Sequence, residues 1–139
     1  MILEEKELFN LIKENIIPDL KPSEGAMSPY DCYSLQYNLD LELKCRRSHY
    51  SELLIEKMKY DSLILRSEKY GTTPIYVNST PKGIWVFRIL DIEQPKWQLK
   101  KMPKTTDFKN NEKIDKEVGF YSVSLGTEIS THLNVLLTL

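Results

Sequence analysis

Three charged residues in one short stretch, Asp31, Glu42 and Lys44, are of the types needed to hydrolyse a phosphodiester bond. Such hydrolysis needs an attacking water, compensation of negative charge in the transition state and help for the leaving alkoxide. Divalent metal ions supply all three when carboxylate oxygens hold them with positions left open for water and phosphate. A nearby ammonium group can orient the water or contact the phosphate. The three residues therefore predict metal-dependent hydrolysis.

A β-hairpin would bring these side chains together. Apolar and polar residues alternate over positions 39–44, which is typical of a strand and places Glu42 and Lys44 on one face. A turn near residues 36–38 would set Asp31 directly opposite Glu42. Cross-strand partners have Cβ atoms about 4.5–5.5 Å apart, so two such carboxylates can share one metal ion.

The same pattern has a second interpretation. Asp40, Glu42 and Lys44 also describe a charged strand face that is merely exposed to solvent. Asp40 is in addition an alternative to Asp31 as the first acidic ligand. The triplet acid-x-Lys occurs elsewhere in the chain, but only at Glu42 does it lie in an alternating strand with an acidic residue one hairpin upstream.

The surrounding sequence indicates the elements that would hold this hairpin. The expected elements are a helix over 3–17, a loop over 18–29, the hairpin over 30–46, a helix over 52–67 capped by Ser51, strands over 74–77 and 84–90, a surface excursion over 91–117, a strand over 118–123 and an apolar tail over 129–139. Gly71 is expected to terminate the second helix. This order predicts one mixed α/β domain over residues 1–139.

Composition limits the remaining possibilities. The formal net charge is only −1, so any surface that attracts nucleic acid must be local. Cys32 and Cys45 have neither the density nor the spacing of a disulfide framework or a zinc site and are expected to be reduced thiols. The chain begins without a signal peptide pattern and has no apolar run of membrane-spanning length, which predicts a cytoplasmic protein with no membrane partner.

Asp31 followed by Glu42-Leu43-Lys44, in this order of helices and strands, resembles the PD-(D/E)XK nuclease superfamily. It is especially similar to the small phage-encoded and Holliday-junction-resolvase-like members. The runs Glu-Leu-Lys-Cys-Arg-Arg at 42–47 and Ile-Glu-Lys-Met-Lys-Tyr-Asp-Ser-Leu at 55–63 extend the resemblance, which spans roughly residues 3–123. Two features depart from it: Pro29 precedes Asp31 by two positions rather than one, and the hairpin turn has no obvious glycine.

The resemblance implies a restriction-endonuclease-like core, with a central mixed sheet flanked by helices. It implies a Mg²⁺- or Mn²⁺-dependent DNA endonuclease, with selectivity for branched DNA and a homodimeric state as finer expectations. Asp31 and Glu42 would be metal ligands, and Lys44 would orient water or contact phosphate. A glutamate on the first helix would join them: Glu5 fits best, with Glu4 as its rival, although Glu5 also suits the helix dipole. The alternative is a catalytically inactive nuclease fold that binds DNA or protein.

Further basic residues are candidates for the same site. Lys59 on the second helix would face the acidic pair, with Lys57 as the alternative, although either also fits a solvated helix flank. The expected DNA contacts are Arg46, Arg47, Lys100, Lys101 and Lys104. The last three lie in the surface excursion, whose acidic residues also fit an ordinary solvated loop.

Overall fold

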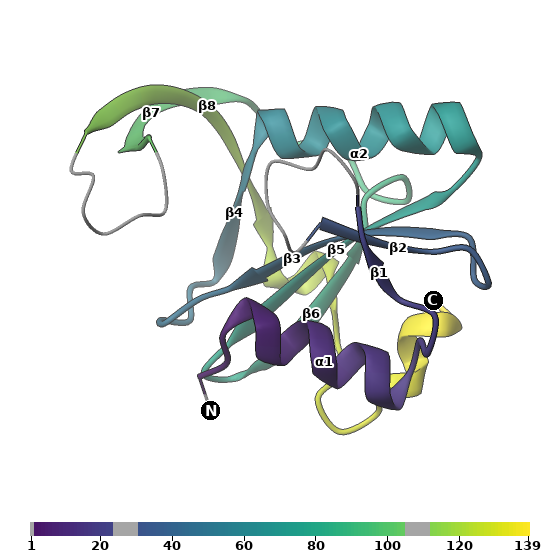
Figure 1. Cartoon of the computed structure of the whole chain (residues 1–139). Helices are drawn as coiled ribbons and strands as arrows, with labels where there is room; N and C mark the ends of the chain where they lie inside the picture. The colour runs from purple at the N-terminus through teal and green to yellow at the C-terminus, as the bar shows by residue number, and fades with distance from the viewer. Residues whose placement is uncertain (1, 24–30, 105–111) are drawn as a thin grey trace.

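A six-stranded sheet forms the centre of the protein, with a helix on each face (Figure 1). The computed structural model describes residues 2–23, 31–104 and 112–139. In spatial order the strands are β1 (Lys21–Pro22), β2 (Asp31–Ser34), β3 (Leu39–Cys45), β5 (Thr73–Thr80), β6 (Gly83–Arg88) and β9 (Thr127–Glu128). Strands β3 and β5 run parallel, and the other neighbours in this sheet are antiparallel. The expected mixed α/β class, with a mixed central sheet and flanking helices, is confirmed.

The helix α1 (Glu5–Asn15) covers one face of this sheet. Leu8 and Ile12 lie one helical turn apart and are buried in the cluster that also contains Leu41 and Leu43 of β3. The apolar spacing therefore predicted the correct helix and the correct buried side. The helix is two residues shorter at each end than expected, as is common for helix boundaries.

The second helix, α2 (Lys57–Tyr70), starts five residues later than expected, so Ser51 is not its N-terminal cap. The segment expected to form its first turn is instead strand β4 (Glu52–Glu56). Leu53 and Ile55, two residues apart, are both fully buried, which is the period of a strand rather than of a helix. Helix α2 and the preceding β4 form the crossover that a parallel pair such as β3 and β5 requires.

A second sheet of three strands, in the order β4-β8-β7, extends from the body of the protein (Figure 1). Strands β7 (Gln98–Pro103) and β8 (Lys113–Ser122) pair antiparallel. The excursion expected over 91–117 lies at the surface, but it contains strand β7 and the start of β8, and its residues 105–111 lie outside the described part of the chain. The strand expected at 118–123 begins earlier, at Lys113. Every residue of β7 is exposed or only partly buried, so no apolar alternation marked it in the sequence.

The C-terminal tail packs against the central sheet, as predicted. Two short 3₁₀ helices, η1 (Val123–Leu125) and η2 (Leu133–Leu137), flank strand β9. Ile129 and Leu136 are buried in the same cluster as the apolar side of α1. The tail thus adds to the core on the α1 face of the sheet.

The turn between β2 and β3 lacks a glycine, and other residues hold it in place. Asn38 adopts a left-handed backbone with φ 56° and donates from Nδ2 to the carbonyl of Gly71. Gly71 is the C-cap that ends α2, as predicted. Asp19, from the segment after α1, accepts hydrogen bonds from Ser34 Oγ (2.6 Å) and from the backbone N–H of Gln36 (2.9 Å). The turn of the hairpin is thus held by hydrogen bonds to Asp19 and Gly71, which lie outside the hairpin.

Replacing Asp19 with Asn should lower the free energy of unfolding by about 1 kcal/mol near pH 7, because charge-assisted hydrogen bonds to the turn are weakened. The hydrogen bonds from Ser34 and Gln36 hold the pKa of Asp19 below its ordinary value of 3.8. A carboxyl whose pKa is lowered by folding stabilises the protein above that value and loses the effect as the pH falls through the lowered pKa. Urea unfolding of both proteins should therefore show a gap in the free energy of unfolding at pH 7 that closes as the pH falls through the lowered pKa of Asp19. A gap independent of pH would contradict this role.

Candidate active site

Asp31 on β2 lies directly opposite Glu42 on β3, as the spacing of the hairpin predicted. Their side chains are only 18% and 8% exposed. The solvated charge ladder considered as an alternative is wrong for this strand, because Asp40 and Glu42 are both buried as residues. Like charges at directly opposed strand positions are destabilising, so this pair requires a cation.

Lys59 reaches the acidic pair from the first turns of α2. Its Nζ lies 3.1 Å from Asp31 Oδ2 and 3.4 Å from Asp31 Oδ1. The same Nζ is 3.7 Å from Glu42 Oε1, and the side chain of Lys59 is 16% exposed. Lys57, the alternative candidate, pairs instead with Asp61 on its own helix at 2.7 Å. The structure therefore brings Lys59, and not Lys57, to the two carboxylates.

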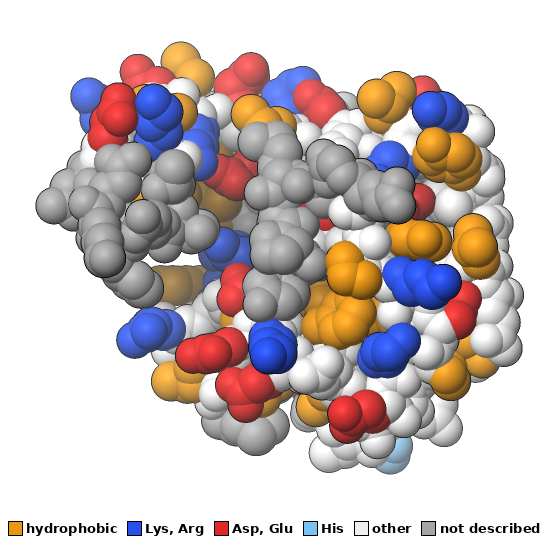
Figure 2. Space-filling view, in the orientation of Figure 1, with side chains coloured by type: hydrophobic (Ala, Val, Ile, Leu, Met, Phe, Trp, Pro, Cys, Tyr) orange, Lys and Arg blue, Asp and Glu red, His pale blue; other side chains and the backbone are white. Residues whose placement is uncertain are grey.

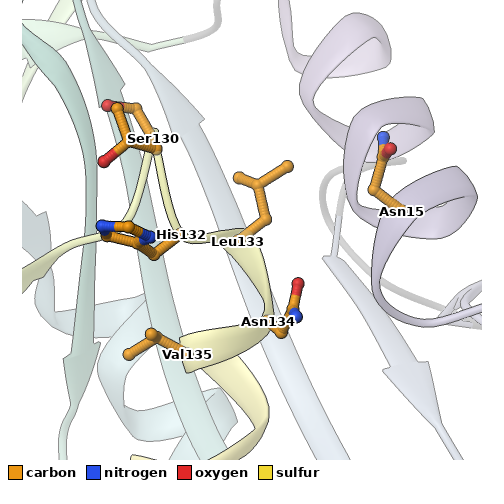
Figure 3. Close-up of a pocket in the computed structure, with 7 residues that line it drawn as sticks. Asn15, Ser130, His132, Leu133, Asn134 and Val135 are labelled. Atoms are coloured by element: carbon orange, nitrogen blue, oxygen red, sulfur yellow. The ribbon is translucent and has the colours of Figure 1, made fainter.

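Asp31, Glu42 and Lys59 line a cavity of about 80 Å³, whose wall also includes Ser23 and Ser62. A larger hollow, of about 480 Å³, lies elsewhere, between the end of α1 and the C-terminal segment. Figure 3 shows Asn15, His132 and Asn134 around it, and no carboxylate lines it. The smaller cavity is the candidate active site because it contains the converging charged groups.

Asp40, the alternative to Asp31, also lines this cavity, as does Arg66, but the two oxygens of its carboxylate are already paired. Its Oδ1 accepts from Arg66 of α2, with Nε and Nη2 both at 3.0 Å. Its Oδ2 accepts from Thr72 Oγ1 at 2.5 Å. Both oxygens are thus bound by groups of the protein, which favours a structural role for Asp40 in fastening α2 and the start of β5 to β3.

Lys44 lies two residues beyond Glu42 on β3 and is half-buried, and it is not among the residues that line the cavity. Within the described residues no ion pair joins its ammonium group to a carboxylate. Arg46, expected to contact phosphate, is bound inside the protein: its Nε donates to Asn78 Oδ1 at 3.0 Å, and its Nη2 donates to the Tyr76 hydroxyl at 3.2 Å and to the Leu54 carbonyl. This arrangement favours a structural role for Arg46, which ties the central sheet to β4.

Glu5 is not among the residues that line the cavity. It is half-buried at the start of α1, which packs on the face of the sheet opposite to Glu42. Its negative charge acts on Cys45, where burial first and Glu5 second raise the pKa of the thiol to about 12. Glu4 is exposed, and its backbone N–H donates to Glu7 within the same helix end. A role for either glutamate in catalysis stays a prediction.

The basic residues expected to contact DNA beyond β3 are all exposed: Arg47, Lys100, Lys101 and Lys104. The three lysines of the β7–β8 hairpin lie among acidic residues. Lys101 lies opposite Asp115, and Lys104 pairs with Glu112 at 3.6 Å. Figure 2 shows basic and acidic side chains side by side over this hairpin. Its charge is therefore mixed rather than uniformly positive.

The donor set of the cavity suits a hard divalent cation. Mg²⁺ is commonly held by one or two carboxylates together with several waters, and Mn²⁺ accepts the same ligands. Asp31 and Glu42 provide that number of carboxylates. In the parts of the chain that the structure describes, no group of three or more His, Cys, Asp or Glu side chains is arranged to hold a metal ion. The residues present fit a cation that keeps much of its water shell.

No protein-family model matches the chain, and no curated protein matches it. Among solved structures, the chain is similar to Hjc, a Holliday junction resolvase from the archaeal hyperthermophile Archaeoglobus fulgidus. The two chains are 15% identical with a TM-score of 0.44, over 74% of this chain and 70% of that one.

No helix in the described part of the chain is both long enough and apolar enough to cross a membrane.

Proposed function

We propose that the protein is a metal-dependent nuclease that hydrolyses phosphodiester bonds in DNA. The observation that carries the proposal is the convergence of Asp31 and Glu42 in one small, largely buried cavity. Among the described residues these two carboxylates share a single ammonium group, that of Lys59, so the cluster retains an excess negative charge. An excess of buried negative charge is costly unless a further cation binds.

The comparison with Asp40 supports a functional rather than a structural interpretation. Asp40 lies on the same strand, and its two oxygens are satisfied by Arg66 and Thr72 at 2.5–3.0 Å. Within the described part of the chain, Asp31 and Glu42 are less completely paired, with Lys59 Nζ at 3.1 Å from Asp31 Oδ2 and 3.7 Å from Glu42 Oε1. Underpaired charges that converge in a cavity are typical of catalytic and metal-binding sites.

Asp31 and Glu42 would hold the metal ion, and bound Mg²⁺ or Mn²⁺ would supply Lewis-acid chemistry and a water of lowered pKa. Lys44, on the same strand and without an ion-pair partner among the described residues, is suited to orient the attacking water or to offset phosphate charge. Arg47, Lys100 and Lys101 are exposed and would contact the DNA backbone, and Lys104 would do so on leaving its ion pair with Glu112.

Selectivity for branched DNA and a homodimeric state belong to this proposal as its finer parts, since a four-way junction presents two equivalent strands to a two-fold symmetric enzyme. The alternative is a catalytically inactive nuclease fold that binds DNA or protein. One observation favours that alternative: within the described residues the two carboxylates have no third acidic ligand. Cleavage assays separate the two functions.

Purified protein should nick supercoiled plasmid in Mg²⁺ or Mn²⁺ and lose this activity in EDTA. Replacing Lys44 with Ala should slow nicking about 100-fold, the scale of a positioned proton-transfer or charge-stabilising group. Lys57→Ala is the matched control, because Lys57 is paired with Asp61 away from the cavity and its removal should leave the rate unchanged. Parallel assays on linear DNA, four-way junctions and RNA would establish the substrate. Equal nicking by all three proteins would point to a contaminant and contradict the proposal.

A further inference from the structure

The ammonium group of Lys59 lies where a cation shared by the two carboxylates would bind. Its Nζ lies 3.1–3.7 Å from both carboxylate oxygens of Asp31 and from one oxygen of Glu42. The cavity that these three residues line has a volume of only about 80 Å³. A hydrated metal ion and the ammonium group therefore compete for the same space.

The charges lead to the same conclusion. Asp31, Glu42 and Lys59 sum to −1, and the ion pair of Asp40 and Arg66, which lines the same cavity, adds no net charge. A divalent cation added with Lys59 in place would raise the sum to +1. Two cations would then lie in contact inside a cavity where burial weakens solvent screening. If Lys59 withdraws, the two carboxylates and the divalent ion sum to zero. Metal binding is thus favoured electrostatically when Lys59 leaves its present position.

We propose that Lys59 is a built-in counter-ion that occupies the metal position and must move out before a divalent cation binds. This inference rests on the proposed metal site. Lys59 is the third residue of α2, its side chain is 16% exposed, and its flexible four-carbon stem can carry the ammonium group to solvent. The ion pair stabilises the metal-free protein, in which two opposed carboxylates would otherwise repel each other.

Competition between Lys59 and the metal ion should lower the metal affinity of the wild-type protein. A ligand that binds only the minor state of a protein has its affinity reduced by the fraction of molecules in that state. If Lys59 is withdrawn in about a tenth of the molecules, removing its charge should strengthen metal binding about tenfold. A lysine whose role was only structural would change stability and leave metal affinity unaltered.

Isothermal titration with Mn²⁺, in the absence of nucleic acid, tests the inference on wild type, Lys59→Met and Lys57→Met. Methionine keeps most of the length of the side chain without its charge. Lys59→Met should bind Mn²⁺ about tenfold more tightly than wild type, and Lys57→Met should match wild type. Thermal unfolding in EDTA should give Lys59→Met a lower Tm than wild type, and Mn²⁺ should raise the Tm of this variant by more than it raises that of wild type.

The outcomes separate this inference from the proposed function. Binding by Lys59→Met that equals or is weaker than wild-type binding, with Lys57→Met unchanged, would overturn the counter-ion role and leave the metal site in place. Absence of Mn²⁺ binding in all three folded proteins would overturn both. Should Lys59→Met fail to fold, Lys59→Gln offers an uncharged side chain that can still donate a hydrogen bond to Asp31, with the same expected tightening.

Discussion

Glu42→Gln should abolish metal-dependent cleavage, with a loss of about 10³-fold or more in rate. The amide keeps the size of the side chain but removes half of the carboxylate pair that holds the cation. Metal ions contribute several kcal/mol to the transition state of phosphoryl hydrolysis, and each 1.4 kcal/mol corresponds to about tenfold in rate. The measurement is the initial rate of plasmid nicking in saturating Mg²⁺, with Mn²⁺ affinity determined in parallel by titration.

The fold should tolerate this substitution. Glu42 and Asp31 repel each other across the hairpin, so neutralising one of them relieves a cost while Lys59 keeps its bonds to Asp31. Glu56→Gln is a suitable control, because Glu56 is also a partly buried acid bonded to a lysine, Lys116, but lies outside the cavity. Loss of activity in both variants, or in neither, would contradict the assignment of Glu42.

Asp40→Asn should behave in the opposite way, losing about 2 kcal/mol of stability and keeping cleavage by the folded protein. Breaking a buried ion pair costs about 3–5 kcal/mol. The cost is smaller here because Arg66 is 28% exposed, while an asparagine can still accept from Thr72 or Arg66. Chemical unfolding gives the stability, and nicking assays well below the transition give the rate.

Asp61→Asn provides the comparison for Asp40. Asp61 is paired with Lys57 on the exposed side of α2, where surface ion pairs contribute little, so its loss should leave stability nearly unchanged. If Asp40→Asn abolished cleavage while remaining as stable as wild type, Asp40 would be the acidic ligand in place of Asp31. The two substitutions on β3 thus distinguish a chemical carboxylate from a structural one.

The β2–β3 hairpin was predictable because residues close together in the sequence determine it. Alternation over residues 39–44 and the symmetric placement of Asp31 and Glu42 about the turn predicted the observed register. The first helix and the terminating Gly71 followed equally from short-range patterns. Lys59 was favoured over Lys57, and the structure places its ammonium group on both carboxylates.

Other features were not predictable because they depend on contacts distant in sequence. Asp40 meets Arg66 across 26 positions, and Arg46 meets Asn78 across 32, with nothing local to mark either pair. The boundary between β4 and α2 was missed because Leu54 and Met58, four residues apart, fit the start of a helical apolar stripe in the sequence. Strand β7 was missed because backbone pairing with β8, rather than burial of apolar side chains, defines it.

The most direct test of the acidic pair is a crystal structure of the protein grown or soaked with Mn²⁺, with data collected at a wavelength where manganese scatters anomalously. We expect one anomalous peak between Asp31 and Glu42, bonded to an oxygen of each at about 2.2 Å, with the Lys59 ammonium group displaced from its present place. No peak at these carboxylates in a crystal saturated with Mn²⁺, or a peak bound only by other residues, would contradict the account.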